Sequence, residues 1–317
     1  MELGGLFRER PLHESRIAIK AYRGLRAAAA RVGVDLVLST FYSPIPRLDR
    51  LPPDSFDRVS DLPGLGWDLE AQVGFLEDQL SGFVSEFHPP ASPAERSDRY
   101  ASENPSYGLL DATVHYGMVR ALRPQRIVEL GSGHSTLVSV EAAQKNAAEG
   151  SPASLRVFDP FPSVVHQGIP GLDALHRTPA QSVSLNVFKE LQDGDILFVD
   201  TTHTVKIGSE VNFVLLEVLP RLRPGVVVHV HDIFLPFEYP RTWIEDLGLY
   251  WNEQYLLQGF LAHNEDWDVL AAVQALSRLR PKRLERWFPA QAVSAGGGSF
   301  WMRRKPEPHG DAYSSDG

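Results

Sequence analysis

The sequence predicts an α/β protein built on a mainly parallel β-sheet. Short continuous apolar segments alternate with helical segments from about residue 107 onward, which is typical of parallel strands covered by helices on both faces. A glycine loop follows the first of these strands and opens a helix. Of the 317 residues, 43% are hydrophobic and 22% are charged, which suits a sizeable buried core.

The strands and helices of this region follow from apolar runs bounded by turn residues. The predicted strands are residues 126–130, 155–159, 175–177, 196–200, 226–230, 267–270 and 299–304. The predicted helices are residues 134–148, 184–191, 212–222 and 243–263. We expect residues 295–298, which are rich in glycine, to form a flexible segment before the last strand.

Residues 1–103 differ in sequence pattern from the rest of the chain, because helical patterns there alternate with proline-rich loops. One helix is predicted over residues 17–31. A second, amphipathic helix is indicated by apolar residues at spacings of three and four: Leu69, Val73, Leu76, Leu80, Phe83 and Phe87. We therefore expect residues 1–103 to be a helical extension that covers the substrate side of the site, residues 104–304 to be the main domain, and residues 305–317 to be a disordered tail.

Composition excludes several classes of function. The net charge of −9 disfavours a nucleic-acid partner, because it repels phosphate backbones. The absence of cysteine excludes disulfides, thiolate metal sites and cysteine nucleophiles. The N-terminal residues lack the apolar core of a signal peptide, and no run approaches 18 apolar residues. We expect a cytoplasmic protein with no membrane partner. Whether the chain forms a homo-oligomer stays open.

The glycine loop after the first strand is a candidate ligand site. Gly131 and Gly133 allow a tight turn and a close approach of the backbone to a ligand, and the following helix offers free N–H groups. Asp159 ends the next strand, where an acid can accept hydrogen bonds from ribose hydroxyls. Packing or capping alone would explain the same residues. A third glycine, expected of a dinucleotide site, is missing, and Glu129 suits a ligand with a free amino group.

These residues resemble motifs I and II of class I S-adenosylmethionine-dependent methyltransferases. Further segments follow in the second half of the chain, after Glu129-x-Gly131-x-Gly133: Phe198-Val199-Asp200-Thr201-Thr202-His203, Leu219-Pro220-Arg221-Leu222-Arg223-Pro224-Gly225 and His229-Val230-His231-Asp232-Ile233-Phe234. These segments resemble the macrocin O-methyltransferase-like branch, methyltransferase family 24, and the resemblance covers roughly residues 40–305. It implies a Rossmann-like doubly wound sheet of seven strands in the order 3-2-1-4-5-7-6.

The resemblance also implies how S-adenosylmethionine is held. The glycine-loop residues and Glu129 bind the methionine part, Asp159 binds the ribose, and the residues after the third strand contact the adenine. The full set of implied cofactor-binding residues is Glu129, Gly131, Ser132, Gly133, Ser135, Asp159, Gln181, Ser182 and Asp200.

A second group of polar residues ends the fourth and fifth strands. Asp200 and His203 follow the fourth strand, and His231 and Asp232 follow the fifth, so the four should converge beside the methyl group. His229 lies on the same face as His231 and is interpreted as a packing residue or as a residue that supports the site from behind. By resemblance, Asp200 and Asp232 are magnesium ligands with His203 as the general base. Because His231 stands where a second acid is expected, and Mg²⁺ prefers oxygen ligands, His231 is only a candidate ligand, and activation by histidine alone stays open.

The sequence thus predicts transfer of a methyl group to a hydroxyl on a small metabolite or natural product. One alternative is a methyltransferase-fold protein that binds the cofactor and does other chemistry or none. Another is a methyltransferase that acts on RNA or protein, which the negative charge and the lack of a basic domain disfavour.

Overall fold

The structure, a computed structural model, describes residues 16–40, 42–92, 98–162, 169 and 171–305. The chain divides into two compact units: Met1–Phe56 with Pro240–Tyr250, and Asp57–Tyr239 with Trp251–Gly317. The first 15 residues of the predicted extension lie outside the described residues, as does the predicted tail except for Lys305. None of the described helices is long and apolar enough to cross a membrane.

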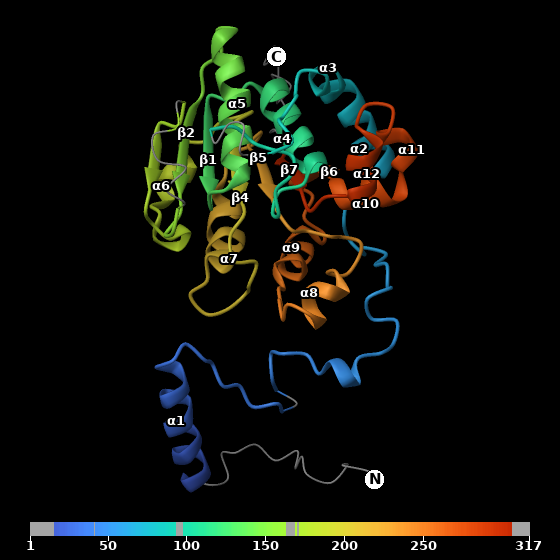
Figure 1. Cartoon of the computed structure of the whole chain (residues 1–317). Coiled ribbons are helices and arrows are strands. Elements are labelled where there is room, and N and C mark those ends of the chain that lie inside the picture. The colour runs from blue at the N-terminus through green and yellow to red at the C-terminus, as the bar shows by residue number, and fades with distance from the viewer. Residues whose placement is uncertain (1–15, 41, 93–97, 163–168, 170, 306–317) are drawn as a thin grey trace, which may run out of the picture. The chain divides into compact units, whose positions relative to one another are not determined.

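The second unit is built on a seven-stranded sheet with the order β3-β2-β1-β4-β5-β7-β6, which confirms the predicted Rossmann-like topology (Figure 1). The first five strands pair in parallel, and β7 runs antiparallel to both β5 and β6. The strands are β1 (Arg126–Leu130), β2 (Ser154–Phe158), β3 (Ala174–His176), β4 (Ile196–Val199), β5 (Val227–Val230), β6 (Trp267–Ala272) and β7 (Phe300–Arg304).

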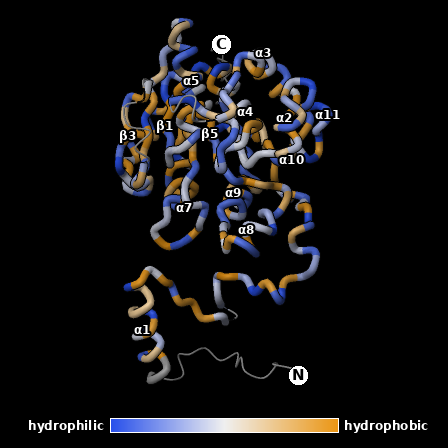
Figure 2. Tube along the Cα trace, viewed as in Figure 1, coloured by the Kyte–Doolittle hydropathy of each residue, from blue (hydrophilic) through white to orange (hydrophobic). Residues whose placement is uncertain are grey.

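Helices cover both faces of this sheet because successive strand residues point to opposite faces. One buried cluster joins Ile127 and Phe198 to α4 (Leu109–Leu122) and α5 (His134–Ala148). The other buried cluster joins Val128 and Leu197 to α6 (Leu185–Lys189), α7 (Glu210–Phe213) and α9 (Glu253–Leu261). The central strands are mainly hydrophobic (Figure 2). The other helices of this unit are α2 (Leu69–Phe75), α3 (Ser81–Val84), α10 (Val273–Leu279), α11 (Pro281–Leu284) and α12 (Ala290–Ala295).

The first unit contains α1 (Arg16–Ala30), a 3₁₀ turn (Leu48–Arg50) and α8 (Arg241–Glu245). The predicted helix over residues 17–31 corresponds to α1. Within this unit the Arg241 guanidinium lies over the Phe56 ring, 4.7 Å from its centroid.

The predicted boundary at residue 103 differs from the division in the structure, because residues 57–103 belong to the second unit. The amphipathic pattern there forms α2, a π-helical turn (Leu76–Leu80) and α3. Its apolar residues Val73, Leu76 and Leu80 are buried in the cluster that contains α4. The Gln72 amide oxygen also accepts a hydrogen bond from the Ala272 N–H at 2.9 Å. This segment is therefore part of the domain core, and the capping role of residues 1–103 stays a prediction.

Two predicted helices are subdivided in the structure. Residues 243–263 form α8 and α9, separated by Gly248 at φ +65° and by the residues around Asn252. Residues 210–221 form α7, a π-helical turn (Val214–Val218) and a 3₁₀ turn (Leu219–Arg221). The Ser209 hydroxyl accepts a hydrogen bond from the Asn212 N–H at 3.3 Å, which starts this segment two residues earlier than predicted.

Candidate active site

The glycine loop lies directly against the end of β4. Gly131 has a φ of +89°, and a Cβ added there would lie 1.8 Å from the Asp200 carbonyl oxygen. Its N–H donates to the Phe158 carbonyl oxygen at 2.9 Å, which ties the loop to the end of β2. Only glycine fits this position, and the loop therefore adjoins the strand ends that carry both Asp159 and Asp200.

Glu129 is fully buried at the base of this loop. Its Oε1 accepts hydrogen bonds from Ser135 Oγ at 2.7 Å and from Thr136 Oγ1 at 3.0 Å. Its Oε2 has no hydrogen-bond partner among the described residues. Burial raises the pKa of Glu129 to about 8, although the two hydroxyl hydrogen bonds act in the opposite direction. A buried carboxylate oxygen without a partner fits a ligand that brings its own ammonium group.

Asp159 follows β2, and its carboxylate is bound to the glycine loop. Ser132 donates to Oδ2 from its N–H at 2.9 Å and from its hydroxyl at 2.5 Å, and the Phe161 N–H donates to Oδ1 at 2.7 Å. A carboxylate has about four acceptor sites, so one remains for a ribose hydroxyl without breaking these bonds. The ribose role of Asp159 stays a prediction.

The remaining predicted cofactor residues lie on the loop and after β3. Gly133 directly precedes α5, and its N–H donates to Thr136 Oγ1 at 3.1 Å. Gln181 and Ser182 belong to a 3₁₀ turn (Ala180–Ser182), and both are exposed. They are accessible for a contact with adenine, which stays a prediction.

His203 is buried and has a φ of +56°, and three carboxylates face its ring. Its Nδ1 lies 2.9 Å from Glu253 Oε2, and its Nε2 lies 3.3 Å from Asp200 Oδ1 and 3.5 Å from Asp232 Oδ2. The Trp251 ring packs against the imidazole with a centroid separation of 4.4 Å. The predicted convergence of Asp200, His203 and Asp232 is therefore present in the structure.

The pKa of His203 differs from the ordinary value that the sequence suggested. Burial lowers it, but the hydrogen bonds and charges of Asp200 and Glu253 more than compensate and raise the pKa to about 10. In this arrangement the imidazole is protonated at neutral pH. It accepts a proton only after losing its own.

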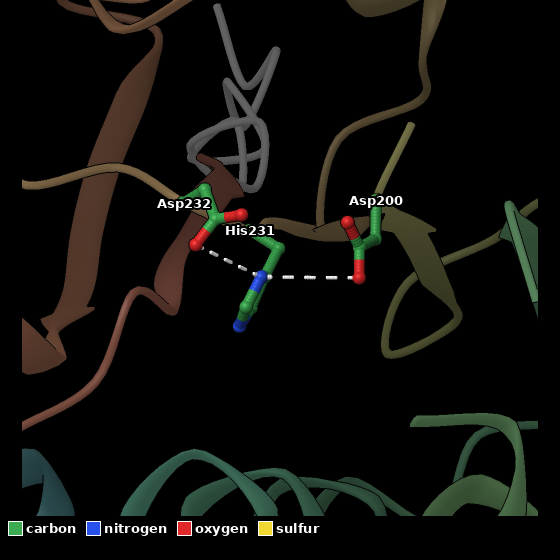
Figure 3. A group of neighbouring side chains, drawn as sticks. All are labelled: Asp200, His231 and Asp232. Atoms are coloured by element: carbon green, nitrogen blue, oxygen red, sulfur yellow. Dashed lines mark ion pairs between the residues drawn. The ribbon is translucent and has the colours of Figure 1, made fainter. Parts of the chain in front are cut away.

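His231 faces the same two aspartates from the other side. Its Nδ1 lies 3.4 Å from Asp232 Oδ1 and 3.8 Å from Asp200 Oδ2 (Figure 3). Its Nε2 lies 3.5 Å from Asp111 Oδ2. Burial lowers the pKa of His231, but Asp232 and Asp200 outweigh it, and the net pKa lies well above the usual value. The imidazoles of His203 and His231 thus each contact both Asp200 and Asp232. A further acid lies on the other side of each ring, Glu253 for His203 and Asp111 for His231.

The residues at this cluster fit a divalent cation. Asp200, His231 and Asp232 can each offer one ligand atom, and these atoms all lie within 4.8 Å of one another. Donors about 2.1 Å from an octahedral ion lie about 3 Å apart when adjacent and about 4.2 Å apart when opposite. The observed distances of 3.4 Å and 3.8 Å from His231 Nδ1 require only a small adjustment.

Two acids of this cluster were not predicted from the sequence. Asp111 lies on α4, where its Oδ2 and Oδ1 accept hydrogen bonds from the N–H groups of Gly298 and Ser299 at 2.9 Å and 3.0 Å. The segment expected to be flexible is thus held in place. Glu253 begins α9, where its N–H and that of Asn252 donate to the His203 carbonyl oxygen at 3.2 Å and 3.0 Å. Glu253 was missed because the sequence predicted one helix over residues 243–263, which placed Glu253 inside a helix and not at the start of one.

His229 was correctly interpreted as a packing residue. It is fully buried, its ring stacks on Phe198 with a centroid separation of 3.9 Å, and its Nε2 lies 3.0 Å from Ser299 Oγ. Burial lowers its pKa well below the usual value, so the ring is neutral.

Comparison with known proteins places this site in a family. Residues 128–233, which hold the glycine loop and both strand-end pairs, match the methyltransferase family 24, described as a methyltransferase domain. An uncharacterized protein of Archaeoglobus fulgidus is 32% identical over 169 residues, which cover 49% of this chain and 73% of that protein.

Two solved structures are similar to this chain at low sequence identity. A CmcI structure with SAH is 16% identical, has a TM-score of 0.38, and covers 69% of this chain and 98% of that one. Phosphoethanolamine N-methyltransferase 2 of Haemonchus contortus, in complex with S-adenosyl-L-methionine, is 12% identical with a TM-score of 0.37, and covers 76% of this chain and 61% of that one. The family match carries the assignment: residues 128–233 belong to a methyltransferase domain of family 24, on a sheet topology typical of class I S-adenosylmethionine-dependent methyltransferases.

Proposed function

We propose that the chain methylates a hydroxyl group on a small metabolite, such as a natural product. One observation carries the proposal: the paired aspartates and histidines lie at the strand ends that adjoin the cofactor loop. A Cβ at Gly131 would lie 1.8 Å from the Asp200 carbonyl oxygen, so the proposed cofactor and the proton-accepting groups share one edge of the sheet. An alcohol needs such groups, since it is a poor nucleophile until it loses its proton.

The proposed cofactor contacts divide among three strand ends. Glu129 receives the ammonium group at its unpartnered Oε2, and Ser132 of the glycine loop and Ser135 of α5 lie beside the methionine part. Asp159 receives the ribose, and the Gln181–Ser182 turn receives the adenine. These contacts align the sulfonium with the acceptor, and alignment supplies much of the acceleration in a methyl transfer.

The proposed proton acceptor is His203, which Glu253 and Asp200 hold from opposite sides at 2.9 Å and 3.3 Å. Asp200 and Asp232 are the proposed ligands of a divalent cation such as Mg²⁺, with His231 beside them. A bound cation would lower the pKa of the acceptor's hydroxyl group. His203 would receive the acceptor's proton in its neutral form, after it has lost its own proton, in a geometry that Glu253 and the Trp251 ring restrict.

The function can be tested with methyl-¹³C-labelled S-adenosylmethionine and a panel of small phenols, sugars and other alcohols. We expect formation of S-adenosylhomocysteine with some of these alcohols, and an O-methyl carbon signal in the product. Methyl signals on nitrogen or carbon would contradict O-methylation. Activity on RNA or protein fractions alone would contradict a small-molecule acceptor.

Binding of S-adenosylhomocysteine should release a proton near pH 7. Glu129 has a pKa of about 8 in the free protein, so it is mostly protonated at pH 7. An ammonium group beside Oε2 favours the carboxylate, which lowers this pKa and expels the proton; affinity should therefore increase as pH rises from 7 to about 8. Calorimetry in buffers of different ionisation enthalpy measures the release.

Two variants isolate the source of this proton. Glu129→Gln should bind more weakly and abolish the release. Asp159→Asn removes a carboxylate from the same site but leaves Glu129, so it should weaken binding and keep the release. Equal proton release by wild type and Glu129→Gln would rule out Glu129 as the ammonium partner.

A further inference from the structure

The cation site of the proposed function contains an imidazole where an all-oxygen site would have a third acid. His231 contributes Nδ1 to the group formed with Asp200 and Asp232, and its side chain is only 5% exposed. A buried ring of this kind cannot turn away to solvent when a cation binds. Its Nδ1 therefore lies beside any cation that the two aspartates would hold (Figure 3).

Asp111 lies behind His231, next to the ring nitrogen that does not face the two aspartates. Its Oδ2 lies 3.5 Å from His231 Nε2, on the side of the ring away from Asp200 and Asp232. The same carboxylate is anchored by the N–H groups of Gly298 and Ser299. A Cβ at Gly297 would lie 2.3 Å from Asp111 Oδ1, so the lack of a side chain at Gly297, in the segment before β7, leaves room for this anchor. A cation bound at Nδ1 would displace the proton there and leave the other proton on Nε2, toward Asp111.

The chemistry of these donors distinguishes among divalent cations. Mg²⁺ binds oxygen ligands and gives up water reluctantly, whereas imidazole suits transition metals, whose affinity for nitrogen-containing sites rises from Mn²⁺ through Co²⁺. An acid behind a ligating histidine fixes the ring and strengthens its nitrogen as a donor. Asp111 has that relation to His231.

We propose that the Asp200–His231–Asp232 group binds a divalent transition-metal ion in preference to Mg²⁺, and that Asp111 positions His231 for this binding. The proposal rests on the cation site of the proposed function, but not on the identity of the acceptor. In this proposal a transition-metal ion takes the place of Mg²⁺ as the preferred ion, and Asp111 is a positioning residue.

Metal binding to the purified full chain tests the proposal without any turnover. Calorimetry with Co²⁺ and with Mg²⁺ should show binding of Co²⁺ at least about tenfold tighter than Mg²⁺. With Mn²⁺ as the probe, electron spin-echo spectroscopy of the wild-type protein should detect coupling to a ¹⁴N nucleus of an imidazole. Equal affinities for Co²⁺ and Mg²⁺, absence of binding, or absence of the nitrogen coupling would each overturn the proposal.

Variants of this site attribute the preference to specific residues. His231→Asp restores an all-oxygen donor set, so the ratio of Co²⁺ to Mg²⁺ affinity should fall about tenfold or more, and the nitrogen coupling should disappear. Asp111→Asn should weaken Co²⁺ binding about 10- to 100-fold, the usual effect of changing an acid behind a ligating histidine. His176→Asp, at an exposed histidine ending β3, should change neither affinity. An unchanged affinity ratio in His231→Asp would overturn the proposal.

The outcome separates this inference from the proposed function. Selective binding of Co²⁺ with a nitrogen coupling, in a chain that methylates no small alcohol, keeps the inference and removes the function. Methylation of an alcohol that persists in a chelator, by a chain that binds no cation, keeps the function and removes the inference.

Discussion

Replacement of His203 by alanine should lower kcat, measured near pH 10 where the imidazole is largely neutral, by about 10²- to 10⁴-fold, the usual contribution of a well-placed general base. The variant removes the imidazole that lies 3.3 Å from Asp200 and 3.5 Å from Asp232. Affinity for S-adenosylhomocysteine should change little, because His203 is not among the proposed cofactor contacts. Single-turnover kinetics with a confirmed acceptor, together with calorimetry, measure the two effects separately.

The pH profile gives this prediction a second readout. The pKa of His203 is about 10, so at pH 7 roughly one molecule in a thousand carries a neutral imidazole. Without added cation, wild-type turnover should therefore rise with pH toward about 10, and His203→Ala should lose this dependence. His176→Ala serves as the control, since His176 stacks on Phe158 outside the cluster. Turnover close to wild type in His203→Ala would remove this residue from proton transfer.

Replacement of Gly131 by alanine should abolish cofactor binding and destabilise the domain. A non-glycine residue at φ +89° costs on the order of 1–3 kcal/mol from backbone conformation alone. The added Cβ would also lie 1.8 Å from the Asp200 carbonyl oxygen, so the end of β4 must move. Thermal unfolding should show a clear decrease in Tm, and calorimetry should show no binding of S-adenosylhomocysteine.

Gly133→Ala is the matched control for this substitution. Gly133 has an extended φ of −176°, and nothing lies within 4 Å of a Cβ added there. Stability should therefore change little, so the decrease in Tm is specific to Gly131. Equal losses of Tm in the two variants would show that the close approach of Gly131 to β4 is not what the domain requires.

The sheet of this protein could be predicted because its signals are local. Each parallel strand is buried on both faces, so runs such as residues 196–199 are apolar throughout and stand out in the sequence. The glycine loop marks its own position, because Gly131 adopts a conformation that other residues rarely adopt. The strand order, by contrast, came from the family resemblance, since no local pattern encodes which strands are neighbours.

The candidate site could be predicted only where its residues directly follow strands. Asp200 and His231 are found by counting from the end of a strand. Asp111 and Glu253 lie on helices, and they reach the cluster through tertiary contacts that no spacing reveals. The raised pKa of His203 was unpredictable for the same reason, since it depends partly on Glu253, 50 residues away in the chain.

Asp111 accepts hydrogen bonds from the N–H groups of Gly298 and Ser299, and these bonds determine when the site can be completed during synthesis. These partners are 187 and 188 residues apart, and nearly all of the sheet is encoded between them. During synthesis, the ribosome completes the glycine loop and the ends of β1, β2 and β4 well before it adds Gly298. A nascent chain therefore possesses the elements proposed to receive the methyl donor before it possesses the residues that anchor Asp111 behind His231. The half of the site proposed to handle the acceptor is completed last, because β7, which lies between β5 and β6, is synthesised after them.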